Sequence, residues 1–220
     1  MPPENIKNWI IENYKPAEPD MLATPLHFTA NEDNSSVSLV CWNDSNSEFI
    51  DSWCEFQYSM TGKDDDWKDY PKEANSEEAK IKLNKDKTVY FRATQGDVDG
   101  NPNLNGFVKY NGNTHHKFIM EGSIKAGGNI QFLLENTGTK MEIPNFCYAY
   151  MFTGCSSLTQ APALPATTLA EYCYTYMFQN CSSLTQAPAL PATTLTNGCY
   201  MFMFQNCSSL TQAPALPATT

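Results

Sequence analysis

Three nearly identical segments follow one another in the C-terminal part of the sequence, and they constrain the fold more than any other feature. They begin at Cys147, Cys173 and Cys199, and the differences 173 − 147 and 199 − 173 are both 26. A fixed period of this size is typical of repeat proteins in which each copy forms one coil. A single coil cannot bury its own apolar side, so the copies must stack and place equivalent residues next to each other in ladders.

The pattern within one copy predicts two kinds of secondary structure. The apolar residues between Leu169 and Met177 follow the i, i+4, i+7, i+8 spacing of one helix face. The segment SSLTQA after Cys181 reads as a short strand, and Pro188 and Pro191 then exclude a helix because they fix φ and lack an amide donor. Each coil is therefore expected to combine a short helix with a short strand.

The repeated sequence MFQNCSSLTQAPALPATTL, with CY before MF, resembles a known family of repeats. It is similar to the methionine-phenylalanine-cysteine variant of BspA-like leucine-rich repeats, which are abundant in surface proteins of gut Bacteroides-type bacteria. The segment KFIMEGSIKAGGNIQFLLE is similar to the connector that precedes such arrays. The resemblance implies an α/β leucine-rich-repeat solenoid over residues 147–220, with a connector or N-terminal cap over 123–146, and exposure at a surface. It implies no particular ligand.

Residues 21–122 show the pattern of an all-β domain. Short alternating segments such as PLHFTA, SVSLVCW, TVYFRAT and GFVKYN (residues 106–111) are separated by turn-forming clusters such as NEDNSS and NKDK. Regular spacing of this kind predicts a β-sandwich of immunoglobulin or fibronectin type, placed before the repeats as a stalk or spacer.

Residues 1–20 are expected to form an amphipathic helix and a linker, with Ile6, Trp9 and Ile10 on one face. Such a helix either packs on the following domain or anchors the protein to a larger assembly. The segment has neither a basic start nor an apolar run, so it does not read as a secretory signal, and no stretch is long enough to span a membrane. The expected location is the cell surface or extracellular space, or the surface of a virion.

Charge divides the sequence into two unlike parts. The net charge of −10 argues against nucleic acid as a partner, since phosphates would be repelled. Beyond Lys140 the only charged residues are Glu142 and Glu171. The repeats therefore present Ser, Thr, Gln and Asn to water, a neutral surface suited to a host or surface protein or to a glycan.

Six of the eight cysteines recur at equivalent repeat positions, namely Cys147, Cys155, Cys173, Cys181, Cys199 and Cys207. The simplest interpretation is that they are small buried fillers with free thiols. A ladder of disulfides between stacked coils is the alternative, because neighbouring strands lie close enough for it. Zinc is not expected, since no CxxC spacing occurs.

No catalytic motif is present in the sequence. It contains no GxSxG, P-loop, HExxH or dinucleotide fingerprint. The Ser and Cys residues of the repeats recur in every coil, as stacking predicts and as a unique active site does not. We therefore expect a non-enzymatic protein without a metal or cofactor: a recognition or adhesion protein or, alternatively, a bacteriophage virion fibre or decoration protein.

Two sets of repeat residues are candidate binding positions. The first is the expected strand face: Thr159, Gln160, Thr185, Gln186, Thr211 and Gln212. The second lies where the copies differ from the first one: Gln179, Asn180, Gln205 and Asn206.

The expected interior consists of Met151, Phe152, Leu158 and Leu164 with their equivalents one and two periods later. The last copy shows no terminal cap. A coil without a cap exposes the apolar surface that a neighbour would cover. We therefore expect either further repeats after Thr220 or a partner at this end, and homo-oligomerisation through this coil or the N-terminal helix is one such arrangement.

Overall fold

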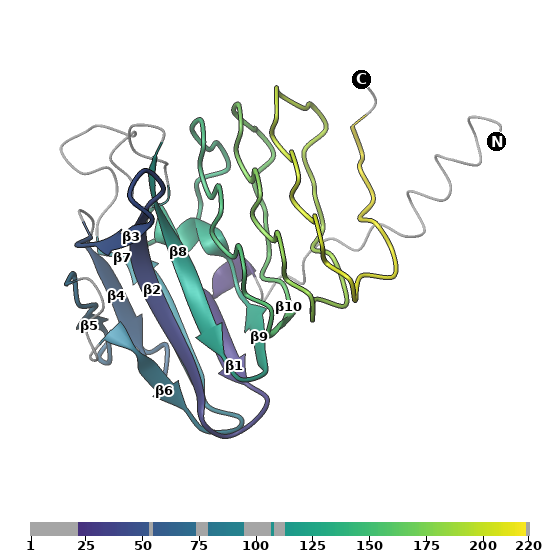
Figure 1. Cartoon of the computed structure of the whole chain (residues 1–220). Coiled ribbons are helices and arrows are strands. Elements are labelled where there is room, and N and C mark those ends of the chain that lie inside the picture. Colours follow the sequence, from purple (N-terminus) through teal and green to yellow (C-terminus); the bar gives the residue numbers. More distant parts are fainter. Residues whose placement is uncertain (1–21, 53–54, 74–78, 95–106, 108–112, 219–220) are drawn as a thin grey trace.

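The computed structural model describes residues 22–52, 55–73, 79–94, 107 and 113–218 (Figure 1). The helix expected within residues 1–20 lies outside this part of the chain, as does most of the strand expected at 106–111. Strands dominate the remainder, with almost no helix. Among the described residues no helix has the length and apolar character needed to cross a bilayer.

The predicted strand segments outside residues 106–111 form strands, and short strands that were not predicted join them. The strands are β1 (Leu26–Ala30), β2 (Ser35–Asn43), β3 (Glu48–Ile50), β4 (Phe56–Ser59), β5 (Lys68–Asp69), β6 (Ile81–Leu83), β7 (Thr88–Ala93), β8 (Thr114–Glu121), β9 (Ile124–Gly127) and β10 (Leu158–Gln160). In β1 and β7 buried residues alternate with half-buried ones, as a strand with one face in a core requires.

The strands form two sheets that pack on a shared core, as the sheets of a β-sandwich do. One sheet has the order β10-β9-β1-β7-β4-β5, and the other has β3-β2-β6 with β8 paired to β2. The longest pairing is antiparallel, between β2 and β8, from Ser36↔Glu121 to Asn43↔Thr114. The ring centroids of Phe28 in β1 and Phe118 in β8 lie 4.7 Å apart, which shows that the sheets face each other.

The connector carries the chain from the sheets to the repeats. Gly122, with φ of 74°, makes the turn from β8 to β9, where a Cβ would collide with Ser35. The 3-10 helix η4 (Ile130–Leu133) follows β9 and begins at Asn129, whose side chain accepts a hydrogen bond from the Gln131 amide at 2.9 Å. The Asn129 side chain also donates to the carbonyl of Gly138 at 2.8 Å, so it ties the connector together.

The expected α/β leucine-rich-repeat solenoid is wrong. Residues 147–218 contain no helix, and β10 in the first copy is their only strand. The second and third SSLTQ segments form no strand, so no continuous sheet runs through the repeats. The copies do lie side by side, as the ladders required (Figure 1), but each coil consists of turns.

The predicted helix is instead a ribbon of consecutive β-turns, shown here for the second copy. Tyr172, Tyr174 and Tyr176 all have φ of 57°, a left-handed conformation that interrupts any helix. The residues between them close turns: the amide of Met177 donates to the Tyr174 carbonyl at 3.1 Å, and that of Gln179 donates to the Tyr176 carbonyl at 3.1 Å. A left-handed bulky residue costs about 1–3 kcal/mol, so contacts between coils must compensate for this strain.

The ribbon imitates a helix in its apolar pattern, which explains the wrong prediction. Its buried positions Cys173, Met177 and Cys181 are spaced by four residues. A period of four differs little from the helical 3.6 over two turns, so the apolar pattern alone does not separate them.

The strand predicted for the second and third SSLTQ segments is absent for a different reason: these segments have no regular strand edge to pair with. The first SSLTQ segment pairs with β9. The second segment has only isolated bonds to the first, such as Thr185 N to Thr159 O at 3.4 Å.

The first two coils share one hydrophobic core with the sheets. Phe152 stacks on Phe118 of β8 at 5.6 Å and contacts Phe28 of β1 at 6.1 Å. The amide of Phe118 donates to the carbonyl of Met151 at 2.9 Å, which attaches the first coil to β8. The repeats are therefore built directly onto the edge of the sheets.

The predicted interior is confirmed for the first two coils and wrong in part for the third. Met151, Phe152, Leu158, Leu164, Met177, Phe178, Leu184, Leu190 and Met203 are buried. In the third coil Phe204 and Leu210 are only half-buried, and Leu216 is 44% exposed. These side chains lack the neighbouring coil that covers their equivalents.

The six repeat cysteines are buried free thiols, as predicted. The second cysteine of each copy donates to a carbonyl of the preceding layer: Cys155 to Phe118 at 3.2 Å, Cys181 to Phe152 at 3.2 Å and Cys207 to Phe178 at 3.0 Å. Burial raises the pKa of Cys155 to about 12 and that of Cys173 to about 12. These thiols therefore stay protonated and serve in packing.

Candidate functional site

The turn ribbon has an inner and an outer side, and the outer side carries the candidate site. In the second copy Tyr174 and Phe178 point into the core and are buried, whereas Tyr176 is half-buried and Asn180 is exposed. Because the pattern has a four-residue spacing, Tyr176 and Asn180 fall on the same side. Repetition turns each of these positions into a column across the coils.

An aromatic column crosses from the sheets into the repeats along this side. His115 of β8 stacks on Tyr150 with ring centroids 4.9 Å apart, Tyr150 stacks on Tyr176 at 5.0 Å, and Tyr176 stacks on Phe202 at 5.0 Å. We call these four residues the outer aromatic column. Its exposure increases toward the last coil, where Phe202 is 49% exposed.

The sheet end of the outer aromatic column lies beside an acidic residue. The Nδ1 atom of the buried His115 is 3.7 Å from a carboxylate oxygen of Asp44. Burial, with a smaller contribution from the charge of Asp44, raises the pKa of Tyr150. The Tyr150 hydroxyl therefore remains a neutral hydrogen-bonding group at physiological pH.

Two predicted binding pairs form amide ladders beside the outer aromatic column. Gln179 Nε2 donates to Gln205 Oε1 at 2.6 Å, and Asn206 Nδ2 donates to Asn180 Oδ1 at 2.8 Å. The structure thus brings these four predicted residues together in adjacent coils. Each amide has donors and acceptors beyond those used in the ladder, which leaves capacity for a ligand.

The other predicted set, the Thr and Gln residues of the SSLTQ segments, lies in a separate part of each coil. Thr159 is half-buried and occupied, since its hydroxyl donates to the Ile124 carbonyl at 3.0 Å and accepts from Asn31 at 3.2 Å. Thr185 donates to the carbonyl of Thr159 at 3.2 Å. The exposed members of the set are Gln160, Thr185, Gln186, Thr211 and Gln212. Within the described chain no hydrogen bond joins this set to the amide ladders.

Sequence reasoning missed the outer aromatic column. The signal was present, because an aromatic residue stands at 150, 176 and 202 in the three copies. The segment that contains Tyr176 was predicted as one face of a helix, and His115 lies far from Tyr150 in the sequence. Only the tertiary structure places β8 against the first coil.

A cavity of about 190 Å³ in the sheets is a second candidate site. It is lined in part by Cys41, Phe56, Tyr70 and His116, and Ser52 Oγ lies 2.8 Å from His116 Nε2. A serine paired with a histidine is a component of nucleophilic catalysis, but catalysis also needs an orienting group and an oxyanion site. The pair alone does not define an active site.

Comparison of the chain with known proteins does not identify it. No family model, curated protein or solved structure matches it. Across the described ranges no group of three or more His, Cys, Asp or Glu side chains is arranged to hold a metal ion.

Proposed function

We propose that the protein is a non-enzymatic recognition protein that binds a host or surface partner through the outer side of its repeats. The sheets form the body that holds the repeats, and the outer aromatic column with the adjacent Gln179–Gln205 and Asn180–Asn206 ladders forms the contact surface. The observation that carries the proposal is the row of stacked, partly exposed rings running through an uncharged surface.

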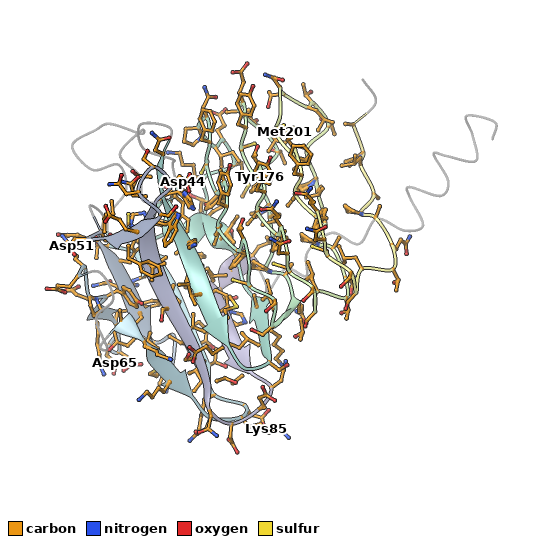
Figure 2. The ribbon with its side chains drawn as sticks, in the orientation of Figure 1. Asp44, Asp51, Asp65, Lys85, Tyr176 and Met201 are labelled. Atoms are coloured by element: carbon orange, nitrogen blue, oxygen red, sulfur yellow. The ribbon has the colours of Figure 1, made fainter. Side chains whose placement is uncertain are left out.

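The composition of this surface supports binding to another macromolecule. Protein interfaces are depleted of charge at their centre and enriched in aromatic residues. Tyrosine adds a large rigid contact area with a hydroxyl, and asparagine and serine add adaptable hydrogen bonds. Figure 2 shows the contrast, since the labelled charged residues Asp44, Asp51, Asp65 and Lys85 lie on the sheet body while Tyr176 and Met201 lie on the repeats.

A protein is favoured over a glycan as the partner. The rings of the outer aromatic column stack face to face, so they cover each other's faces and present mainly edges and hydroxyls. Edges and amides suit a protein surface better than a sugar ring that needs an open aromatic face. The net charge of −10 disfavours nucleic acid.

Two locations of the protein fit this function. The first is a bacterial cell surface or the extracellular space, where the protein would act in adhesion. The second is a bacteriophage particle, where it would act as a fibre or decoration protein that contacts the host bacterium. The two differ in the cells that should be bound.

Binding to intact cells tests the proposal. Fluorescently labelled protein would be applied to cultured epithelial cells and to gut Bacteroides-type bacteria, and bound fluorescence measured. We expect saturable binding that falls at least about tenfold, or about 1.4 kcal/mol, in a Tyr150→Ser, Tyr176→Ser double variant, because central interface aromatics dominate binding energy. Binding to epithelial cells favours adhesion, and binding to the bacteria favours the virion hypothesis.

Met60→Ala is the matched control, because Met60 is 38% exposed and lies on the sheets. It should leave binding unchanged, and circular dichroism should show that all variants are folded. Loss of binding after protease treatment of the cells indicates a protein partner, and loss after periodate indicates a glycan. Equal binding by the double variant and the parent protein would refute the proposed surface.

A further inference from the structure

One edge of β2 is only partly paired, so a gap remains in the sheet. On this edge Ser35–Val37 pair with β6 and Cys41–Asn43 pair with β3. Residues 38–40 between them have no strand partner on this edge in the described part of the chain, although β8 pairs with them on the opposite edge. Figure 1 shows β3 and β6 near opposite ends of β2. We call the opening between β3 and β6 the β2 gap.

The cavity of about 190 Å³ lies in the β2 gap. Its lining includes residues from each segment around the gap: residues 38–41 of β2, Phe49 and Ile50 of β3, and Ala79 and Lys80 just before β6. An engineered cavity of about 150 Å³ with an apolar lining binds benzene. The β2 gap therefore has room for one aromatic ring with a small substituent.

The backbone of Leu39 leaves one polar group in the β2 gap. Its amide donates to the hydroxyl of Tyr70 at 2.8 Å, and that hydroxyl donates to the Ala79 carbonyl. Tyr70 thus takes the place of a ladder bond that β6 would supply. The Leu39 carbonyl points to the same edge as its amide, because the two groups of one residue in an antiparallel strand face the same side.

This carbonyl has no hydrogen-bond partner within the described residues. Leu39 is 5% exposed, so the carbonyl is shielded from bulk water. Buried carbonyls are nearly always paired in folded proteins. The Leu39 carbonyl is therefore an acceptor to which a bound molecule with an N–H or O–H group can contribute the missing bond.

Most of the enclosed lining around this carbonyl is apolar. The side chains of Cys41 and Phe56 are each 3% exposed, and both line the cavity. Ser52 and His116 add a polar corner, where Ser52 Oγ lies 2.8 Å from His116 Nε2, so these two groups already contact each other. An apolar cavity with a few polar groups is the usual form of a small-molecule site.

The charged residues of the lining indicate the charge of the ligand. Lys72 Nζ lies 2.8 Å from Glu55 Oε1, and Lys80 Nζ lies 2.7 Å from Glu121 Oε2. Both lysines among the described lining residues are therefore paired within the protein. Glu73 adds a negative charge to the lining. A neutral ligand is thus favoured over an anionic one.

We propose that the β2 gap binds a small neutral molecule that carries an N–H or O–H donor on one aromatic ring, of the size of phenol. The ring packs against Ile50 and Phe56, and the donor bonds to the Leu39 carbonyl. Binding involves no covalent step. The site lies in the sheets, away from the outer side of the repeats, and its test is independent of the function proposed above.

Three probes of equal ring size test this proposal: phenol, benzene and benzoate. Each is titrated into the intact protein while amide chemical shifts are followed by NMR. We expect saturable binding of phenol that shifts the amides of Leu39, Ile50 and Ala79. Benzene should bind at least about tenfold more weakly, because it leaves the carbonyl unpaired. Benzoate should not bind saturably.

Ala79→Leu places a larger side chain in the wall of the cavity and should abolish phenol binding. Ala93→Leu is the matched control, since Ala93 is also 6% exposed but does not line the cavity, and this variant should bind phenol as the parent does. Circular dichroism checks the folding of both variants. If Ala79→Leu does not fold, intermolecular nuclear Overhauser effects from phenol to Leu39 and Phe56 in the parent protein locate the ligand.

Three outcomes would overturn the proposal. Absence of saturable phenol binding would show that solvent alone satisfies the Leu39 carbonyl. Equal affinity for phenol and benzene would show that the carbonyl takes no part, and equal affinity for benzoate would contradict the neutral ligand class. Shifts or Overhauser effects confined to residues outside the β2 gap would place the ligand elsewhere.

Discussion

The second and third coils have almost the same sequence but very different environments. Residues 173–194 and 199–220 differ only at Thr175 against Met201 and Tyr176 against Phe202. Phe178 is fully buried whereas Phe204 is half-buried, and the exposed fraction rises from 2% for Leu190 to 44% for its equivalent Leu216. The same residue is thus core in one coil and surface in the next, because a neighbour, and not the sequence, supplies the burial.

The backbone shows the same difference. The second coil forms hydrogen bonds with both neighbours, since Tyr174 N donates to Cys147 O at 3.0 Å and Tyr176 N donates to Met201 O at 3.0 Å. Within the part of the chain that the structure describes, the third coil forms backbone hydrogen bonds to a neighbouring coil on one side only. Paired substitutions in the two copies therefore measure the contribution of a neighbouring coil with the local sequence held nearly constant.

The largest difference in stability between the two coils is expected for Phe178 and its equivalent Phe204. Phe178→Ala removes a fully buried ring and should lower the free energy of unfolding by about 3–5 kcal/mol. Phe204→Ala removes a half-buried ring and should lower it by less than half of that. Urea denaturation followed by circular dichroism measures both, and equal losses would show that the third coil is as well covered as the second.

The next largest difference in the free energy of unfolding is expected between Leu190 and its equivalent Leu216. Leu190→Ala leaves a cavity and should cost about 2–5 kcal/mol, near the lower end because the coil can partly collapse. Leu216→Ala at the exposed position should stay within about 0.5 kcal/mol of the parent protein. A clearly larger loss for Leu216→Ala, comparable to that of Leu190→Ala in the same denaturation assay, would contradict its exposure.

A smaller contrast is expected between the first and second coils at the inner tyrosines. The buried Tyr148 hydroxyl donates to Gln131 Oε1 at 2.7 Å and contacts the Ile130 carbonyl at 3.0 Å. The buried Tyr174 hydroxyl has no partner among the described residues. Tyr148→Phe should therefore cost about 1–3 kcal/mol, because it leaves polar groups unsatisfied, whereas Tyr174→Phe should be neutral or stabilising.

Thermal unfolding of the two tyrosine variants measures this contrast, with the change in unfolding temperature converted to free energy. Phenylalanine keeps the ring, and both stacking ladders stay intact, so packing is the same in the two variants. A loss in Tyr174→Phe equal to that in Tyr148→Phe would show that the Tyr174 hydroxyl finds a partner in solution.

The smallest effect on stability is expected at the amide ladder. Gln179→Ala removes the bond from Gln179 to Gln205, which spans the second and third coils in an exposed setting. The expected cost is about 0.5 kcal/mol, since exposed side-chain hydrogen bonds exchange readily with water. Gln205→Ala removes the acceptor of the same bond and should have the same small cost. A cost several times larger in urea denaturation would make the ladder a main support of the stack and weaken its role as a contact surface.

Much of the sheet region could be predicted because its local pattern matches its final structure. The alternation in LHFTA and TVYFRA, with turn clusters between strands, gave β1 and β7 the correct positions. The immunoglobulin or fibronectin topology stays a prediction. The short strand β9 lay inside the expected connector, and its partner is β1, far away in sequence.

The candidate site was predicted in part. Gln179, Asn180, Gln205 and Asn206 were found because they vary against an otherwise repeated background, a comparison internal to the sequence. The outer aromatic column was missed because its first ring belongs to His115 in β8 and its second to Tyr150 in the first coil. No local pattern predicts that these two segments meet.

The sequence by itself determined the period, the ladders and the buried thiols of this protein. Identical copies that stack must place Tyr on Tyr and Cys near Cys, whatever the conformation of the coil. The tertiary structure alone decided that each coil is a ribbon of turns, because a four-residue apolar spacing suits both a helix and a ribbon, and the bonds to the neighbouring coil select between them. It also decided which copy is core and which is surface, since burial depends on the adjacent layer: β8 and β9 cover the first coil, while nothing among the described residues covers the third.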